Sequence, residues 1–305
     1  MFRLIFPRRD SLVKCAILKH FDRKTPYQER EIGNMKYKLI ASDMDGTLLT
    51  DGKQITDRTL SAVRAAENAG MIFTVCTGRS YSGIKEYVGK LRPSVPLITF
   101  NGAMIVSPEG DLLYDRPMDP SYAMQIYRAA ENEDTTLKVW SRGILYANRI
   151  NEATMYYRST CPDAEFHILG DELEMKRIAE QGISKMLIID TKERISGFLS
   201  GMCKTLGDGV RYFRSTPIYL EFVEKSVSKG SALLRLCEML GVDPAQTVAF
   251  GDEENDRPML RAAGLGVAMG NAVPEIKTEA DAVTSSNEED GVAEFIEYLL
   301  EMENK

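Results

Sequence analysis

The sequence predicts an α/β protein in which a parallel-sheet core domain is interrupted by an inserted α+β domain. From residue 35 onward, short apolar runs alternate with stretches of helical period, which is typical of parallel strands covered by helices on both faces. Polar residues follow several of these runs directly, as expected where strands end at a ligand-binding edge. Between residues 119 and 216 the pattern changes to paired strands and separate helices, which indicates the insert.

The first part of the core is predicted as strands separated by helices. Strands are predicted over residues 38–42, 71–76 and 96–100. Helices are predicted between them, over residues 57–69 and 80–91. Thr56 is placed to cap the first helix and Gly70 to end it. A turn signal at 108–110 inside an apolar stretch predicts a hairpin directly after the third strand.

The insert and the second part of the core follow the same logic. In the insert, helices are predicted over 122–132, 173–181 and 194–206, and strands over 137–141, 144–148, 185–190 and 210–214. In the returning core, helices are predicted over 229–240 and 256–263, and strands over 247–250 and 265–269. Ser228 can cap the first of these helices and Gly241 can close it.

These patterns give the expected domain organisation. The core is assigned to residues 35–118 and 217–305, and the insert, which we call the cap, to residues 119–216. Residues 1–34 show no hydrophobic period linking them to the sheet, so we expect a poorly ordered N-terminal extension, with Met35 as the natural start.

Composition excludes several classes of function. A net charge of −7 does not suggest a nucleic-acid-binding surface, and no apolar run is long enough to cross a membrane. The five cysteines are scattered, odd in number and without a C-x-x-C pair, which favours a reducing cytoplasmic location over disulfides or a thiolate zinc site. Two distant histidines give little support to imidazole-rich metal sites or to Ser-His-Asp chemistry.

The residues at the carboxyl ends of the core strands point to a site. Asp43 and Asp45 follow the first strand, Thr77 the second, Asn101 the third and Asp252 a later one. In an open parallel sheet these ends share one edge. Because carboxylates gathered at one place need a cation, and no His or Cys accompanies them, the pattern favours a hard ion such as Mg²⁺.

Other interpretations of these residues fit less well. A simple turn would explain Asp43 and Asp45, but not the polar residues after the other strands. In a calcium loop starting at Asp43, glycine would stand at the sixth position rather than the fourth, and Gln54 would be Glu. Cys76 and Arg79 are too close together for a thiolate phosphatase loop, and "GLGVAMG" has the wrong spacing for a dinucleotide fingerprint.

Four motifs in order carry a family resemblance. "DMDGTLL", "VCTGR", the lysine of "SKGSAL" and "GDEENDRPML", with a large insert between the second and third, resemble the haloacid dehalogenase-like (HAD) phosphatases. "ITFNGAMI" and the insert look like the Cof-type branch, which has an α/β (C2B-type) cap on a Rossmann-like core. The resemblance covers about residues 36 to 302 and departs mainly at Cys76, where a smaller residue is usual.

The resemblance implies roles for the acidic residues. Asp43 would be the nucleophile that forms an aspartyl-phosphate, and Asp45 the general acid and base. Mg²⁺ would bind the Asp43 carboxylate, the Asp45 backbone carbonyl and Asp252. Asp256 would support the metal ligands or Lys229.

It also implies the groups that hold the phosphate. Thr77 and the Gly78 amide would bind phosphoryl oxygens, and Lys229 would balance the developing charge. Asn101 and Asn255 resemble contacts to the phosphate or the leaving group. Arg79 could join them or be a solvated surface charge.

The expected function is Mg²⁺-dependent hydrolysis of a small phosphorylated metabolite, with sugar phosphates first and flavin mononucleotide or pyridoxal phosphate next. A phosphosugar mutase on the same frame stays open, and a non-catalytic sugar-phosphate-sensing or scaffold protein is the alternative outside enzymes. The cap would select the substrate, and its candidate selectors are Trp140, Arg142, Tyr146 and Arg149. Neither a nucleic acid nor a membrane is expected as partner, and the oligomeric state is left open.

Overall fold

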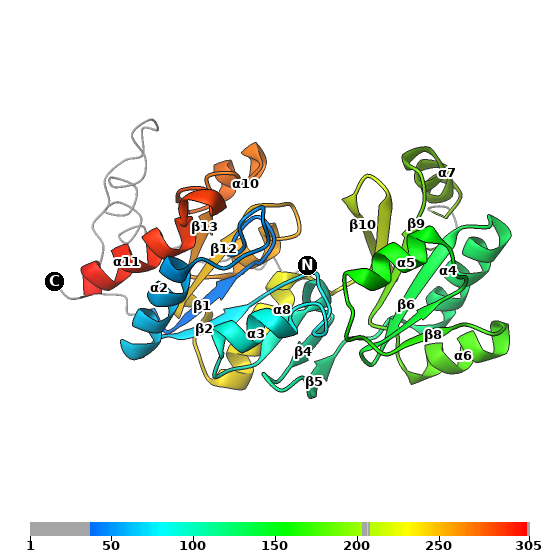
Figure 1. Cartoon of the computed structure of the whole chain (residues 1–305), viewed down its shortest axis with the longest axis horizontal. Helices are drawn as coiled ribbons and strands as arrows, with labels where there is room; N and C mark the ends of the chain where they lie inside the picture. Colours follow the sequence, from blue (N-terminus) through cyan, green and yellow to red (C-terminus); the bar gives the residue numbers. More distant parts are fainter. Residues whose placement is uncertain (1–36, 203–205, 207, 304–305) are drawn as a thin grey trace, which may run out of the picture. The chain divides into compact units, whose positions relative to one another are not determined.

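The computed structural model describes residues 37–202, 206 and 208–303 (Figure 1). The chain forms two compact units, Met1–Phe73 with Cys237–Lys305, and Thr74–Leu236. The expected N-terminal extension, residues 1–34, lies outside the described residues. These units are defined only by packing within each of them, so they do not test where the expected core ends and the expected cap begins. Those boundaries stay a prediction.

The first unit is built on a parallel sheet with the strand order β14-β13-β12-β1-β2. Its strands are β1 (Leu39–Ser42), β2 (Ile72–Val75), β12 (Thr247–Gly251), β13 (Leu265–Ala268) and β14 (Ala282–Val283). The pairs β1–β12, β12–β13 and β13–β14 are parallel. β1, β12 and β13 are buried along their whole length, as the continuous apolar runs predicted.

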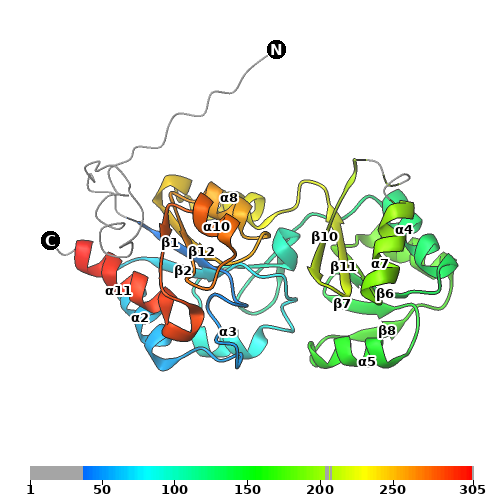
Figure 2. The ribbon, with the colours of Figure 1, turned by 90° about the horizontal axis from the view of Figure 1, so that it is seen from above.

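Helices cover both faces of this sheet. Those of the first unit are α2 (Asp57–Asn68), α9 (Arg257–Ala262), α10 (Pro274–Glu279) and α11 (Gly291–Glu303). α2 and α11 lie side by side on one face, and α10 lies on the other (Figure 2). This follows from right-handed crossovers, because the chain moves from β1 to β2 in one direction and from β12 to β14 in the opposite one.

The second unit contains a small antiparallel sheet that continues from the end of β2. Its strands are β3 (Leu97–Thr99), β4 (Met104–Val106) and β5 (Leu112–Asp115). β3 was expected within the parallel sheet. Instead, it is joined by a single parallel bridge, between Ile98 and Cys76, to the residue that follows β2. Helix α3 spans Lys85–Leu91 and not 80–91, because the Ser80 hydroxyl accepts the Gly83 amide at 3.2 Å and closes a turn.

A six-stranded sheet fills the rest of the second unit, in the order β10-β11-β9-β6-β7-β8. Its strands are β6 (Thr136–Ser141), β7 (Ile144–Ala147), β8 (Phe166–Ile168), β9 (Lys185–Ile189), β10 (Val210–Thr216) and β11 (Tyr219–Glu224). Its helices are α4 (Pro120–Asn132), α5 (Glu152–Ser159), α6 (Glu172–Gln181) and α7 (Lys192–Met202). α8 (Lys229–Leu240) then leads back to β12. The sequence did not predict α5, β8 and β11.

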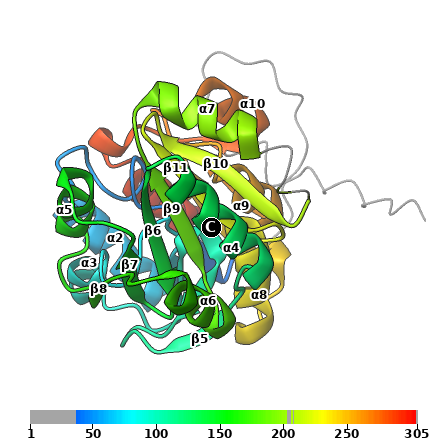
Figure 3. The ribbon, with the colours of Figure 1, turned by 90° about the vertical axis from the view of Figure 1, so that its right-hand side faces the viewer.

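The two faces of the six-stranded sheet differ in chemistry. α4, α6 and α7 cover one face, where Leu137, Val139 and Met186 join a continuous apolar core (Figure 3). On the strands β6 and β9 the alternate residues Lys138 and Lys185 point to the opposite face, although both are buried. Charged side chains are rarely buried on the face of a sheet, so this face is a candidate for a functional role.

Within the described ranges, no helix is both long and apolar enough to cross a lipid bilayer.

Candidate active site

The turn after β1 holds Asp43 in a fixed backbone position. The Asp43 amide donates to the carbonyl of Phe250 at 3.0 Å, which continues the pairing of β1 with β12 by one residue. Gly46 has φ +77°, and a Cβ there would lie 2.3 Å from Oδ2 of Asp252. Only glycine therefore lets the Asp43 loop come this close to the acid that follows β12.

Three carboxylates meet at the ends of β1 and β12. Oxygens of Asp43, Asp252 and Asp256 all lie within 4.8 Å of one another, and all three residues are buried. The Thr47 hydroxyl donates to Oδ1 of Asp252 at 2.9 Å. Buried carboxylates this close repel one another unless a cation is added, so the donor set fits a hard divalent ion.

Asp256 differs from the other two because it also organises the backbone. Its Oδ2 accepts the amides of Asp252 at 2.9 Å and Glu253 at 3.0 Å. A Cβ on Gly251 would lie 2.4 Å from the Asp256 Cβ, so this carboxylate sits directly against the end of β12. This geometry fits the expected supporting role, in which Asp256 orients Asp252.

Asp45 is more exposed than the three clustered acids. Its carboxylate accepts from the Lys53 ammonium at 2.9 Å, and its side chain is 42% exposed. Asn255 lies half-buried in the turn between β12 and α9. The structure thus gathers Asp43, Asp252 and Asp256 into one cluster and leaves the Asp45 side chain accessible to solvent.

The phosphate-binding candidates lie in the second unit, on two loops that are joined by backbone hydrogen bonds. The Thr77 amide donates to the Ile98 carbonyl oxygen at 2.9 Å, and the Asn101 amide donates to the Thr77 carbonyl oxygen at 2.9 Å. Phe100 and Asn101 both have positive φ, at 50° and 56°. Consecutive left-handed residues cost about 1–3 kcal/mol each and mark functional turns. A Cβ on Gly78 would lie 3.1 Å from both polar atoms of the Asn101 side chain.

Lys229 reaches this region through α8. Gly102 has φ +101°, and a Cβ there would lie 2.3 Å from the Ser228 carbonyl oxygen, so glycine allows the helix start to pack on the Asn101 turn. The Ser228 hydroxyl accepts the Ser231 amide at 3.0 Å, as the predicted cap requires. Lys229 is buried, and its carbonyl lies 4.0 Å from the Cys76 sulfur, which gives this unusual cysteine a packing role.

Arg79 lies in the turn before α3 and contacts the start of that helix. Its Nη1 donates to the Gly83 carbonyl at 3.4 Å, and its guanidinium lies 5.5 Å from the ring centre of Tyr87. These contacts favour a local structural role over phosphate binding.

Comparison with known proteins identifies the family. Residues 40–296 match the haloacid dehalogenase-like hydrolases. The chain belongs to this family. It is 33% identical to the phosphatase YwpJ of Bacillus subtilis, over 86% of this chain and 100% of that protein. It is 29% identical to 5-amino-6-(5-phospho-D-ribitylamino)uracil phosphatase YitU of the same organism, over 86% and 97%. A haloacid dehalogenase-like hydrolase of Bacteroides thetaiotaomicron superimposes with a TM-score of 0.78 at 28% identity, over 87% and 100%.

In this HAD-like hydrolase one buried ion pair was not found from the sequence. Lys185 on β9 lies 3.2 Å from Glu221 on β11, and both side chains are less than 10% exposed. Burial acts to lower the pKa of Lys185, but nearby negative charge, led by Glu221, leaves that pKa raised. The lysine that begins the apolar run "KMLIID" is a sequence signal for a buried charge. Its partner Glu221 lies far along the chain, and no local pattern indicates that the two meet.

The four residues expected to select the substrate have different surroundings. Trp140 is buried, its ring centre lies 5.1 Å from that of Phe100, and its Nε1 donates to the Tyr157 hydroxyl at 3.0 Å. Arg142 donates to a backbone carbonyl, Tyr146 stacks on His167, and Arg149 pairs with Asp134. Trp140 is thus the candidate selector whose ring packs against Phe100, next to the predicted site residue Asn101.

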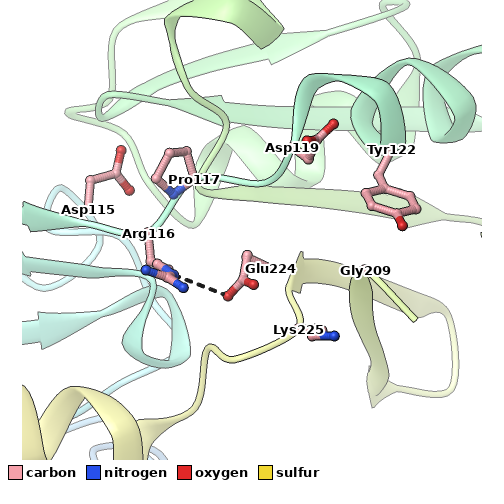
Figure 4. A pocket seen from close by; sticks show the side chains of 8 residues that line it. All are labelled: Asp115, Arg116, Pro117, Asp119, Tyr122, Gly209, Glu224 and Lys225. Carbon is pink, nitrogen blue, oxygen red and sulfur yellow. Dashed lines mark hydrogen bonds and ion pairs between the residues drawn. The ribbon is translucent and has the colours of Figure 1, made fainter. Parts of the chain in front are cut away.

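A shallow pocket lies elsewhere in the second unit (Figure 4). It lies between the segment Asp115–Asp119 and the end of β11, where Arg116 and Glu224 approach to 3.5 Å. The Arg116 side chain is 53% exposed, so this pair contributes little stability. The pocket contains no predicted site residue.

Proposed function

We propose that the chain is a Mg²⁺-dependent phosphatase that hydrolyses a small phosphorylated metabolite through an aspartyl-phosphate on Asp43. The observation that carries the proposal is the buried cluster of Asp43, Asp252 and Asp256 directly after two parallel strands. Such a cluster suits a cation and a nucleophilic carboxylate together, and relatives in the family are named phosphatases.

The proposed reaction has two steps at Asp43. The carboxylate attacks phosphorus, the ester P–O bond breaks, and Asp45 donates a proton to the leaving alcohol. Asp45 then takes a proton from the water that attacks the aspartyl-phosphate, which releases inorganic phosphate and restores Asp43. The exposure of the Asp45 side chain, which lets it exchange protons with water, supports this division of roles.

The other groups hold and screen the phosphate. Mg²⁺, bound by the carboxylates of Asp43 and Asp252 and the Asp45 carbonyl, would supply positive charge that reduces repulsion between nucleophile and phosphate. Thr77 and the Gly78 amide would donate to phosphoryl oxygens, and Lys229 would neutralise charge that develops in the transition state. Asn101 and Asn255 would contact the phosphate or the leaving group, and Asp256 would keep Asp252 in place.

We place sugar-type phosphates first among the substrates, with flavin mononucleotide and pyridoxal phosphate next. The name of the relative YitU describes a phosphate on a ribityl chain, which is a sugar-alcohol phosphate. A cytoplasmic location belongs to the same proposal, and the free thiols of Cys76, Cys161 and Cys237 support it.

The decisive experiment is Asp43→Asn. We expect hydrolysis of an aryl phosphate to fall to background, because an amide is a poor nucleophile and a weak Mg²⁺ ligand. Asp57→Asn, an exposed acid in the first turn of α2, is the control and should keep wild-type activity. EDTA should abolish activity and added Mg²⁺ should restore it.

Two outcomes would redirect the proposal. Wild-type turnover in Asp43→Asn would exclude the aspartyl-phosphate mechanism. An isomeric sugar phosphate formed without release of inorganic phosphate would identify a mutase instead.

A further inference from the structure

The ammonium of Lys185 has three close neighbours. It lies 3.2 Å from Oε2 of Glu221 and 3.3 Å from the carbonyl oxygen of Gly78, and 5.4 Å from the ring centre of Phe100. A carboxylate and a carbonyl receive two of its three N–H donors, and the ring of Phe100 lies within the distance of a cation–π contact. Lys185 is therefore placed to hold protein groups in position and not to bind a substrate itself.

The Gly78 carbonyl belongs to a peptide that is held at both ends. In a trans peptide the C=O and N–H bonds point in opposite directions. The C=O of the Gly78–Arg79 peptide faces Lys185, and its N–H donates to Oγ1 of Thr77 at 3.1 Å. A cation on the carbonyl side polarises the peptide and strengthens the N–H donor. A hydrogen-bond chain thus runs from Glu221 through Lys185 and one peptide to Thr77.

This chain sets the direction of the Thr77 hydroxyl. A threonine hydroxyl has one proton and two lone pairs. Because one lone pair receives the Arg79 N–H, the hydroxyl proton must point away from that amide. Thr77 is buried at the end of β2, so a fixed donor there is suited to a phosphoryl oxygen.

The aromatic contact extends the same control to the second loop. Phe100 stands beneath the Lys185 ammonium, and its amide donates to the Arg79 carbonyl at 3.1 Å. The next residue, Asn101, is another phosphate-side candidate. One buried cation therefore touches both loops that would hold the phosphate.

We propose that Lys185, held by Glu221, is a positioning residue that orients the Thr77 hydroxyl and the neighbouring Phe100 turn for phosphate binding. This inference rests on the proposed function and deepens it. A buried ion pair kept only for stability could be replaced by apolar side chains of similar size. The inference requires instead that such a replacement restores folding without restoring catalysis.

The test compares Lys185→Met with Lys138→Met. Both remove a buried lysine from the same face of the sheet, but Lys138 contacts the Thr154 hydroxyl and neither loop. Below the melting temperatures, we expect Lys185→Met to lower kcat/KM for an aryl phosphate roughly 10- to 100-fold and to weaken inhibition by inorganic phosphate. Lys138→Met should change neither quantity.

Two further variants separate position from stability. In Lys185→Met/Glu221→Leu we expect the melting temperature to recover while kcat/KM stays low. In a Thr77→Val background, adding Lys185→Met should lower kcat/KM by a smaller factor than it does in the wild type, since one of the two groups through which it acts is already gone. Recovery of kcat/KM in the first variant, or full multiplication of the two losses in the second, would overturn the proposal.

Phosphate binding separates this inference from the proposed function. If the wild-type protein hydrolyses no phosphate ester, the proposed function fails. Calorimetric binding of inorganic phosphate in the presence of Mg²⁺ still tests whether Lys185 positions groups that bind phosphate. Tighter binding by wild type than by Lys185→Met supports the positioning role. Equal binding by both proteins, or none by the wild type, contradicts it.

Discussion

Lys138 and Lys185 bury the same functional group on the same face of one sheet, yet their surroundings differ. Lys185 faces Glu221, a carbonyl and an aromatic ring. Lys138 donates to the Thr154 hydroxyl at 2.7 Å, and no carboxylate of the described residues lies within ion-pair distance of it. Burial, with a smaller contribution from Arg149, lowers the pKa of Lys138 to about 7, whereas the pKa of Lys185 is raised.

The difference shows that burial alone does not decide whether a lysine side chain is charged. A lysine can be buried at neutral pH by giving up its proton, or it can keep the proton when a carboxylate is buried with it. Only the second arrangement provides a permanent cation, and in this chain that cation contacts the two loops proposed to hold the phosphate. Among the described residues, Lys229 is the third buried lysine, and its own role can be compared with these two.

The largest effect is expected from Lys229→Ala. If this lysine neutralises charge in the transition state, kcat should fall about 100- to 1,000-fold. Lys229→Arg should rescue it only in part, because a planar guanidinium does not replace a compact ammonium. Steady-state kinetics with an aryl phosphate measure this, and Lys225→Ala, an exposed lysine four residues earlier, is the control. Wild-type turnover in Lys229→Ala would place this lysine with Lys138, outside the reaction.

A smaller effect, on stability alone, is expected from Lys138→Met. The folded-state pKa of about 7 lies below the ordinary value of 10.5, so the unfolded chain binds more protons between these limits. The cost of burying Lys138 is therefore fully present below pH 7 and disappears as the pH rises toward 10.5. The variant should melt several degrees above wild type at pH 7, and the Thr154 hydroxyl keeps its bond to the Arg149 carbonyl.

Melting curves at pH 7 and pH 9.5 check the sign. The advantage of Lys138→Met over wild type should shrink at the higher pH, and comparing the two proteins cancels the other titrating groups. An equal advantage at both values would mean that Lys138 keeps its proton in the folded protein up to pH 9.5, so that burial does not lower its pKa.

The smallest effect is expected from starting the chain at Met35. Residues 1–34 show no hydrophobic period that would tie them to the sheet, so their removal should not change the surroundings of the buried lysines or of the acidic cluster. Activity should be unchanged and the melting temperature should move by less than about 2 °C. A loss of several degrees would show that the segment contributes packing.

The sequence predicted the elements whose signals are local. Strands β1, β2 and β12 and helix α8 begin and end within about two residues of their predicted bounds, because apolar runs and caps define them. The acids after β1 and β12 were expected to meet because parallel strands share an edge, and Asp43 and Asp252 do meet.

What the sequence could not give depends on contacts between distant residues. β11 was missed because Glu221 interrupts its apolar run, and a buried acid looks like a surface residue until its partner is known. α5 was missed because just one of its residues, Thr154, is fully buried, so it lacks an apolar stripe. Both missed elements contribute to the charged face of the sheet.

The close packing of Gly102 on Ser228 also bears on the order of folding. All strands of the six-stranded sheet lie between these two residues in the sequence, so the contact cannot form during synthesis until the whole sheet has been made. A sheet that folds first brings the two ends of its segment together and reduces the chain entropy lost in the last step. The lysine at the start of α8 would then be among the last groups to reach its place, and a slowly folding insert would delay activity without altering the finished enzyme.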